Sequence, residues 1–341
     1  VSSDLTWEKA STFNIGLDFT MLNQRLDFSF DWYQRTTSDM LVKVEYPEVL
    51  GTTAPPANKA ELRTRGWEVS VKWNDRIGND FSYDLGFILS DSQAEITKYE
   101  NPSGTLSDYY VGQKIGEIWG YETEGFYQSD TDVQNHADQS KLGANWAPGD
   151  IMYKDLDGNK KINNGSNTLD DHGDLKVIGN TTPRYQYGIT ANMSYKNVYL
   201  NVFFQGIGKR DFWPSSQPFW PVATQYYNTQ KWFVTDSWSE DNRDAYFARP
   251  IARETKNQQK QTKYLQDASY CRLKNLTVGY DFPKSWLSFL HVAKAGVYFS
   301  AENLFEFTNV KGAYDPEAAG KNGTMVYPFQ RTYSFGLNVT F

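Results

Sequence analysis

One segment of this 341-residue chain has the side chains and the spacing of a calcium-binding loop. Calcium takes about six to eight oxygen ligands, and a common protein loop supplies them from positions 1, 3, 5, 7 and 9. In this chain those positions are Asp155, Asp157, Asn159, Lys161, which would act through its carbonyl, and Asn163. The spacing therefore predicts a structural Ca²⁺ that would rigidify the surrounding loop and would take no part in catalysis.

The same segment departs from the calcium-loop pattern at two positions. Position 6 is Lys160 where glycine is usual, and position 12 is Ser166 where a bidentate carboxylate is usual. The following cluster of Asp170, Asp171 and Asp174 could supply the missing carboxylate after an insertion. A turn rich in Asp and Asn that binds no ion also fits these residues. Both interpretations stay open at this stage.

A second set of candidate residues consists of aromatic rings in a polar segment, residues 207–266. These rings could form platforms for sugar faces, or they could pack the segment onto itself and onto a partner protein. We favour packing, because an aromatic loop commonly needs its rings as a core. The residues that we assign to this substrate or partner loop are Trp213, Trp220, Tyr226 and Trp232.

Catalytic patterns are missing from the sequence. The three histidines, His136, His172 and His291, match no metal or nucleophile motif, and no nucleotide-binding fingerprint occurs. We therefore expect no enzyme activity. A formal net charge of −7 also argues against nucleic acid as a partner.

The elements that would position these residues are strands. Apolar and polar residues alternate with a period of two over nine segments, as expected for strands with one apolar and one polar face. Aromatic residues make up 16% of the chain, which argues against disorder. No run approaches the roughly 18 apolar residues of a membrane-spanning helix. The nine segments are residues 13–19, 26–32, 67–73, 81–89, 185–195, 198–204, 276–282, 293–301 and 333–341.

The connections between these segments alternate between short turns and long loops. The long connections are approximately residues 43–61, 99–183, 207–266 and 306–330. An antiparallel meander with turns at one end and loops at the other is typical of an outer-membrane barrel. Several alternating runs also reach the roughly 9 to 11 residues of a tilted membrane strand. A soluble all-β fold remains the alternative, although its strands are commonly shorter.

Several sequence blocks resemble one protein family. The blocks are residues 7–9 with 13–19, 25–33 with 39–41, 112–116 with 119–121 and 125–128, 149–158 with 178–180 and 183–188, 270–280, 301–305 and 312–317. The most specific block is GDIMYKDLDG at 149–158. In order and in content, they resemble the C-terminal part of SusC/RagA-type TonB-linked outer-membrane transporters of Bacteroidetes.

The resemblance implies an all-β fold: an antiparallel transmembrane β-barrel, of which residues 1–341 would be the C-terminal nine strands of 22. The plug and the N-terminal regions would be absent, and segments 99–183 and 207–266 would be large extracellular loops. The implied function is TonB-dependent import of a glycan or oligopeptide across the cell outer membrane. The implied partners are a SusD-like lid lipoprotein, TonB through the missing part, and outer-membrane lipid. A secreted, soluble β-sandwich that binds carbohydrate is the alternative function.

Overall fold

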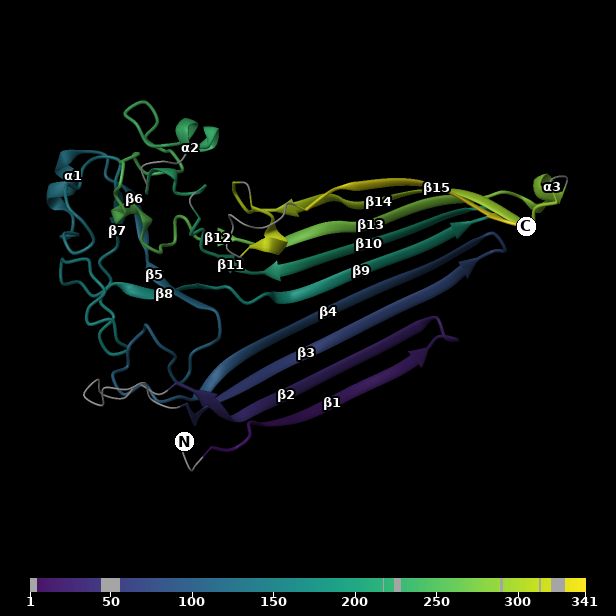
Figure 1. Ribbon diagram of the computed structural model, residues 1–341, viewed down its shortest axis with the longest axis horizontal. Helices are drawn as coiled ribbons and strands as arrows, with labels where there is room; N and C mark the ends of the chain where they lie inside the picture. Colours follow the sequence, from purple (N-terminus) through teal and green to yellow (C-terminus); the bar gives the residue numbers. More distant parts are fainter. Residues whose placement is uncertain are drawn as a thin grey trace.

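The computed structural model describes residues 5–43, 56–216, 218–223, 228–288, 291–312, 314–319 and 329–341. Its largest element is one antiparallel sheet of nine strands that pair in the order β1-β2-β3-β4-β9-β10-β13-β14-β15 (Figure 1). The strands are β1 (Lys9–Met21), β2 (Leu26–Val42), β3 (Ala57–Ile77), β4 (Phe81–Lys98), β9 (Arg184–Tyr195), β10 (Val198–Lys209), β13 (Tyr270–Asp281), β14 (Lys294–Thr308) and β15 (Thr332–Thr340). Each of the nine predicted segments lies inside one of these strands, with at most one residue beyond the strand's end.

Several strands extend beyond the predicted segments. Strand β3 is 21 residues long and begins at Ala57, inside the stretch 43–61 that the sequence predicts as a loop. Its first half includes the charged residues Glu61, Arg63 and Arg65, so the apolar alternation is absent there. The backbone ladder with β2 and β4 nevertheless continues through this half. Hydrophobic periodicity therefore marks only the part of a strand that has one apolar face.

The cross-strand register places apolar residues in rows across one face of the sheet. One row crosses all nine strands through Met21, Leu26, Trp73, Leu85, Ala191, Val202, Leu276, Ala301 and Tyr333. This apolar face is open to its surroundings: Leu17 is 56% exposed and Leu337 66% exposed. The opposite face carries polar rows, one of which runs through Asp84, Asn192, Asn201, Thr277, Ser300 and Ser334.

Tyrosine rings on the polar face lie over glycines of the neighbouring strand. Tyr199 is paired in register with Gly279, and a Cβ at Gly279 would lie 2.1 Å from the Cζ atom of that ring. Tyr298 lies over Gly336 in the same way, with 2.2 Å to its Cζ. These glycines are therefore required for close approach of the ring to the sheet.

We expect Gly279→Ala to destabilise the sheet by about 1–3 kcal/mol, because the added methyl group overpacks against the Tyr199 ring. Urea unfolding of the full-length protein in lipid vesicles measures this loss. Asn201→Ala is the matched control, since Asn201 is exposed on the same face of the neighbouring strand β10. Equal unfolding midpoints for the two variants would contradict the packing of Tyr199 over Gly279.

The two ends of the sheet differ, as the sequence predicts. At one end, residues 22–25, 78–80 and 196–197 form short turns, and residues 282–293 include the helix α3 (Lys284–Leu287). The C-terminus lies at this end (Figure 1). The strand ends that flank the long connections lie at the other end. The predicted alternation of connection lengths is thus confirmed.

The two largest loops contain small elements of their own. They are β5 (Glu117–Tyr121), β6 (Thr123–Phe126), α1 (Asp130–Asn135), β7 (Ile151–Tyr153) and β8 (Leu175–Asn180) in the first loop, and β11 (Asp211–Phe212), η2 (Pro221–Ala223), α2 (Lys231–Thr235), η3 (Lys256–Gln258) and β12 (Gln266–Asp267) in the second; η5 (Pro316–Ala318) follows β14. Strand β5 pairs with β8, β6 with β7, and β11 with β12. Among the described residues, no helix is long and apolar enough to cross a membrane.

Candidate functional site at the loop end of the sheet

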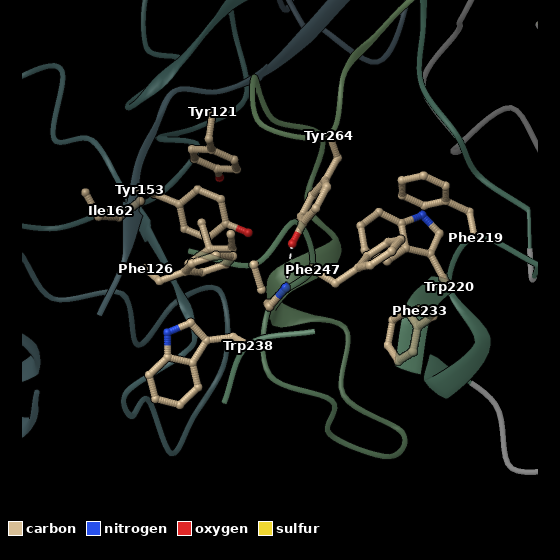
Figure 2. Packing of buried hydrophobic residues seen from close by; sticks show 13 residues of the cluster. Tyr121, Phe126, Tyr153, Ile162, Phe219, Trp220, Phe233, Trp238, Phe247 and Tyr264 are labelled. Carbon is tan, nitrogen blue, oxygen red and sulfur yellow. Dashed lines mark hydrogen bonds between the residues drawn. The ribbon is translucent and has the colours of Figure 1, made fainter. Parts of the chain in front are cut away.

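The loops 99–183 and 207–266 share one hydrophobic core, and we call the two together the loop unit. The first loop contributes Tyr121, Phe126, Ile151, Tyr153 and Ile162, and the second contributes Phe219, Trp220, Phe233, Trp238, Ala245, Phe247, Ala248 and Tyr264. Figure 2 shows these rings from both loops gathered together, with Phe219 and Trp220 beside Phe247. The loop unit is therefore a folded body and not a pair of independent loops.

The aromatic residues that the sequence assigns to a substrate or partner loop occupy different places. Trp220 is 8% exposed, and its indole N–H donates to the Pro214 carbonyl at 2.6 Å. Because its ring is covered, Trp220 offers no platform for a sugar. Trp213 and Trp232 are partly buried and pack against the same core. Tyr226 lies outside the described residues.

A buried charge cluster joins the two loops. The Asp150 carboxylate is fully buried and accepts two hydrogen bonds of 2.9 Å from Arg249, while the ammonium of Lys256 lies 3.0 Å away. Asn257 donates to the same carboxylate at 2.9 Å. Sequence reasoning missed this cluster, because its members are about a hundred positions apart and match no motif. Buried charges persist when they are paired and hydrogen-bonded, as here.

Two buried tyrosines support this cluster as neutral groups. The Tyr153 hydroxyl donates to the Lys256 carbonyl at 2.7 Å, and the Tyr264 hydroxyl accepts from the Ala248 N–H at 2.7 Å. Burial raises the pKa of Tyr153 and of Tyr264 well above the ordinary tyrosine value. Both hydroxyls therefore stay protonated and serve only as hydrogen-bonding groups.

A second anchor holds residues 314–319 against the wall of the sheet. Arg272 on β13 is 1% exposed; its guanidinium donates to Asp315 at 2.6 Å and to Glu317 at 2.7 Å. Lys274, two residues further along the same strand, bonds Glu317 at 3.1 Å. These contacts fix residues 314–319 to β13.

The predicted calcium segment forms a tight turn on the outside of the loop unit. Asp155 accepts from the backbone N–H groups of Gly158 and Lys160, each at 2.8 Å. Lys160 has φ = 60°, so it adopts the left-handed conformation that glycine usually provides at this position. Ile162 is fully buried in the core and attaches the turn to the loop unit. The backbone thus adopts the curvature of a calcium loop despite the lysine.

The structure brings together three carboxylates in this turn, those of Asp155, Asp157 and Asp174, with ligand atoms within 4.8 Å of one another. Asp174 is fully buried and accepts from the N–H groups of Leu156 at 2.7 Å and of Asn163 at 2.9 Å. Within the described ranges, no Lys or Arg pairs with any of the three.

Most of the other predicted ligand residues make hydrogen bonds within the turn. Asn159 and Asn163 direct side-chain oxygens to the backbone N–H groups of Lys161 and Gly165, each at 2.7 Å. Asp170 is exposed, and Asp171 instead accepts from the Ser166 hydroxyl at 2.6 Å. That hydrogen bond lowers the pKa of Asp171. Of the three carboxylates that the sequence offers here, Asp174 is therefore the one that lies with Asp155 and Asp157.

The convergence of three unpaired carboxylates suits a hard divalent cation, so the calcium site stays a prediction. We expect Ca²⁺ removal by a chelator to increase proteolysis of residues 99–183 in the full-length protein. The double substitution Asp155→Ala, Asp157→Ala should give the same proteolysis with and without calcium. Asp170→Ala is the control and should keep the calcium response. A double variant as calcium-protected as the wild type would refute the site.

Comparison with known proteins assigns the class that this fold and loop unit define. The family described as "TonB dependent receptor-like, beta-barrel" matches residues 1–304, and the chain belongs to that family. The predicted SusC/RagA resemblance is confirmed.

Particular relatives make the assignment more specific. The chain is 30% identical to TonB-dependent receptor P3 of Formosa agariphila, over 100% of this chain and 35% of that protein. It is 27% identical to TonB-dependent receptor SusC of Bacteroides thetaiotaomicron, over 100% of this chain and 32% of that protein. The solved structure of the RagAB peptide transporter matches with a TM-score of 0.74 and 25% identity, over 99% of this chain and 36% of that one. The chain therefore spans about a third of the length of these relatives.

Proposed function

We propose that this chain forms part of the wall and the external loops of a TonB-dependent importer in the outer membrane. The observation that carries the proposal is the apolar row that crosses all nine strands on an exposed face, with polar rows on the opposite face. Lipid would cover the apolar face and water would fill the space inside the polar face.

The wall that we propose is a closed barrel, and the two outer strands of the sheet support this proposal. Strands β1 and β15 are its two outer strands. Hydrocarbon does not tolerate unpaired strand edges, because their backbone groups would lack hydrogen-bond partners. We infer that further strands of the same protein complete the wall, to the 22 strands that the family resemblance implies.

The cargo that we propose is a glycan or an oligopeptide. The solved relative described as a peptide transporter supports the oligopeptide, and the glycan rests on the SusC-type resemblance of the sequence. The loop unit would lie at the extracellular mouth, where a SusD-like lipoprotein would cover it. TonB would supply energy through a plug, and import would involve no chemical conversion of the cargo.

Membrane fractionation combined with gel mobility tests this proposal. We expect the full-length protein in the outer-membrane fraction, with a band that shifts on heating, because a closed barrel resists unfolding by detergent. A soluble β-sandwich would be recovered in the soluble fraction and would show no shift, and that result would reject the importer. The comparisons offer no support for the sandwich alternative.

Deleting the gene tests the cargo. We expect the deletion strain to lose uptake of one labelled glycan or oligopeptide and to regain it with the wild-type gene. Unchanged uptake of every glycan and peptide that the parent strain consumes would contradict the assignment as an importer of these nutrients.

A further inference from the structure

A hollow of about 530 Å³ lies where the two large loops meet, between β5 and the segment around residue 260. Backbone hydrogen bonds between the two loops hold its sides in place. The N–H of Tyr121 donates to the Lys260 carbonyl at 2.8 Å, and the N–H of Thr262 donates to the Tyr121 carbonyl at 3.1 Å. The side chains that matter here are Trp119, Trp213, Lys141, Lys260, Asn164 and Gln259.

The hollow carries positive charge without a partner. No Asp or Glu among the described residues lines it, while Lys141 and Lys260 are both exposed there. In the part of the chain that the structure describes, neither ammonium group makes an ion pair or a hydrogen bond. Lys154 and Lys176, elsewhere in the same loop, both bind Glu122. An unpaired pair of cations in a chain of net charge −7 indicates a site for an anion.

Two tryptophan rings and the side-chain amides of Asn164 and Gln259 also line the hollow. Trp119 is partly exposed: its indole N–H is bonded to the Tyr110 hydroxyl at 3.0 Å and its ring packs against His172 at 5.4 Å between centroids, so only the exposed part of the ring is left for a ligand. The side-chain amides of Asn164 and Gln259 make no hydrogen bond within the described residues. Aromatic faces with a few polar groups are the usual lining of a small-molecule site.

This combination favours a sugar over a peptide. A pyranose offers a flat C–H face for a tryptophan ring and hydroxyl groups for amides. An extended peptide that binds by strand addition would instead need a free strand edge. Here β5 pairs with β8 on one edge and bonds residues 260 and 262 on the other, so its edges are occupied.

We propose that this hollow binds an acidic sugar unit, a uronate or a sulfate ester, of the glycan to be imported. The proposal rests on the proposed import function and narrows its substrate class. Lys141 and Lys260 would bind the acid group, Trp119 and Trp213 would contact the ring, and Asn164 and Gln259 would bind its hydroxyl groups. The site would concentrate the glycan at the mouth before it enters the barrel.

Calorimetric titration of the purified full-length protein tests the hollow with four probes: an oligogalacturonate, a sulfated galactan oligosaccharide, a neutral malto-oligosaccharide and an acidic peptide. The test variant is Lys141→Gln, Lys260→Gln. The control is Lys154→Gln, Lys176→Gln, which removes the same charge outside the hollow. We expect the test variant to bind at least one acidic glycan about tenfold or more weakly, because charge-assisted hydrogen bonds are lost. The control should bind like the wild type.

The outcomes distinguish a uronate from a sulfate ester, and they distinguish failure of this site from failure of the import function. Loss of uronate binding alone or of sulfate binding alone supports the site and identifies its acid. Equal affinities for the test variant and the control overturn it, as does an effect confined to the acidic peptide or the neutral glycan. Such a failure in a protein that still shows the heat-dependent gel shift leaves the import function standing. Absence of that shift would instead reject the importer itself.

Discussion

The substitution Ile189→Arg is expected to prevent stable assembly of the full-length protein in the outer membrane. Ile189 is 40% exposed on the apolar face of β9, between its partners Phe87 and Phe204. An arginine on a lipid-facing barrel position costs about 2–4 kcal/mol near the middle of the bilayer. Outer-membrane levels and the heat-dependent gel shift measure the effect.

Asn192→Arg is the matched control for that substitution. Asn192 lies on the same strand, is exposed on the polar face, and donates to Asp84 at 3.2 Å. An arginine there would stay in water next to a carboxylate, so we expect normal assembly. If both variants assembled equally, or if only Asn192→Arg failed, the assignment of the two faces would be wrong.

The second large effect is expected from Asp150→Ala in the loop unit. The substitution leaves the side chain of Lys256, which is 1% exposed, without its carboxylate partner. Removing one partner of a buried ion pair costs about 3–5 kcal/mol. We expect the loop unit to open while the strands stay intact. Protease added to whole cells should then cut residues 99–183 and 207–266 and leave a heat-modifiable barrel.

Glu122→Ala provides the control for the buried cluster. Glu122 also binds two lysines, Lys154 and Lys176, but its side chain is 27% exposed. An exposed ion pair contributes about 0–1 kcal/mol, so protease resistance should be nearly unchanged. Resistance of Asp150→Ala equal to that of Glu122→Ala would show that the buried cluster does not hold the two loops together.

The strands were predictable because each apolar face leaves a local signal. Phe13, Ile15 and Leu17 alternate with Asn14, Gly16 and Asp18, and a period of two is readable within one segment. The beginning of β3 was not readable, because the charged residues Glu61 and Arg63 occupy the alternate positions that are apolar further along the strand. There the backbone hydrogen bonds of β3 are made with its neighbours β2 and β4, and the sequence of β3 alone does not indicate that pairing.

The site was predictable only in part, for the same reason. The turn at Asp155 and Asp157 is local and its spacing is visible, whereas the third carboxylate comes from beyond an insertion of unknown path. The structure shows that Asp171 bonds Ser166 and leaves Asp174 to close the turn. The contact of Asp150 with Lys256 spans more than a hundred residues, so only the folded loop unit brings them together.

Site-directed spin labelling of β10 tests the central claim that one face of this sheet contacts lipid and the other faces water. Labels would be placed singly at 198–205 in the full-length protein in lipid vesicles, with Cys271 replaced by Ser. We predict that positions 198, 200, 202 and 204 are relaxed by oxygen dissolved in lipid, and that positions 199, 201, 203 and 205 are relaxed by a water-soluble nickel complex. Equal accessibility at successive positions, or the opposite alternation, would contradict the account.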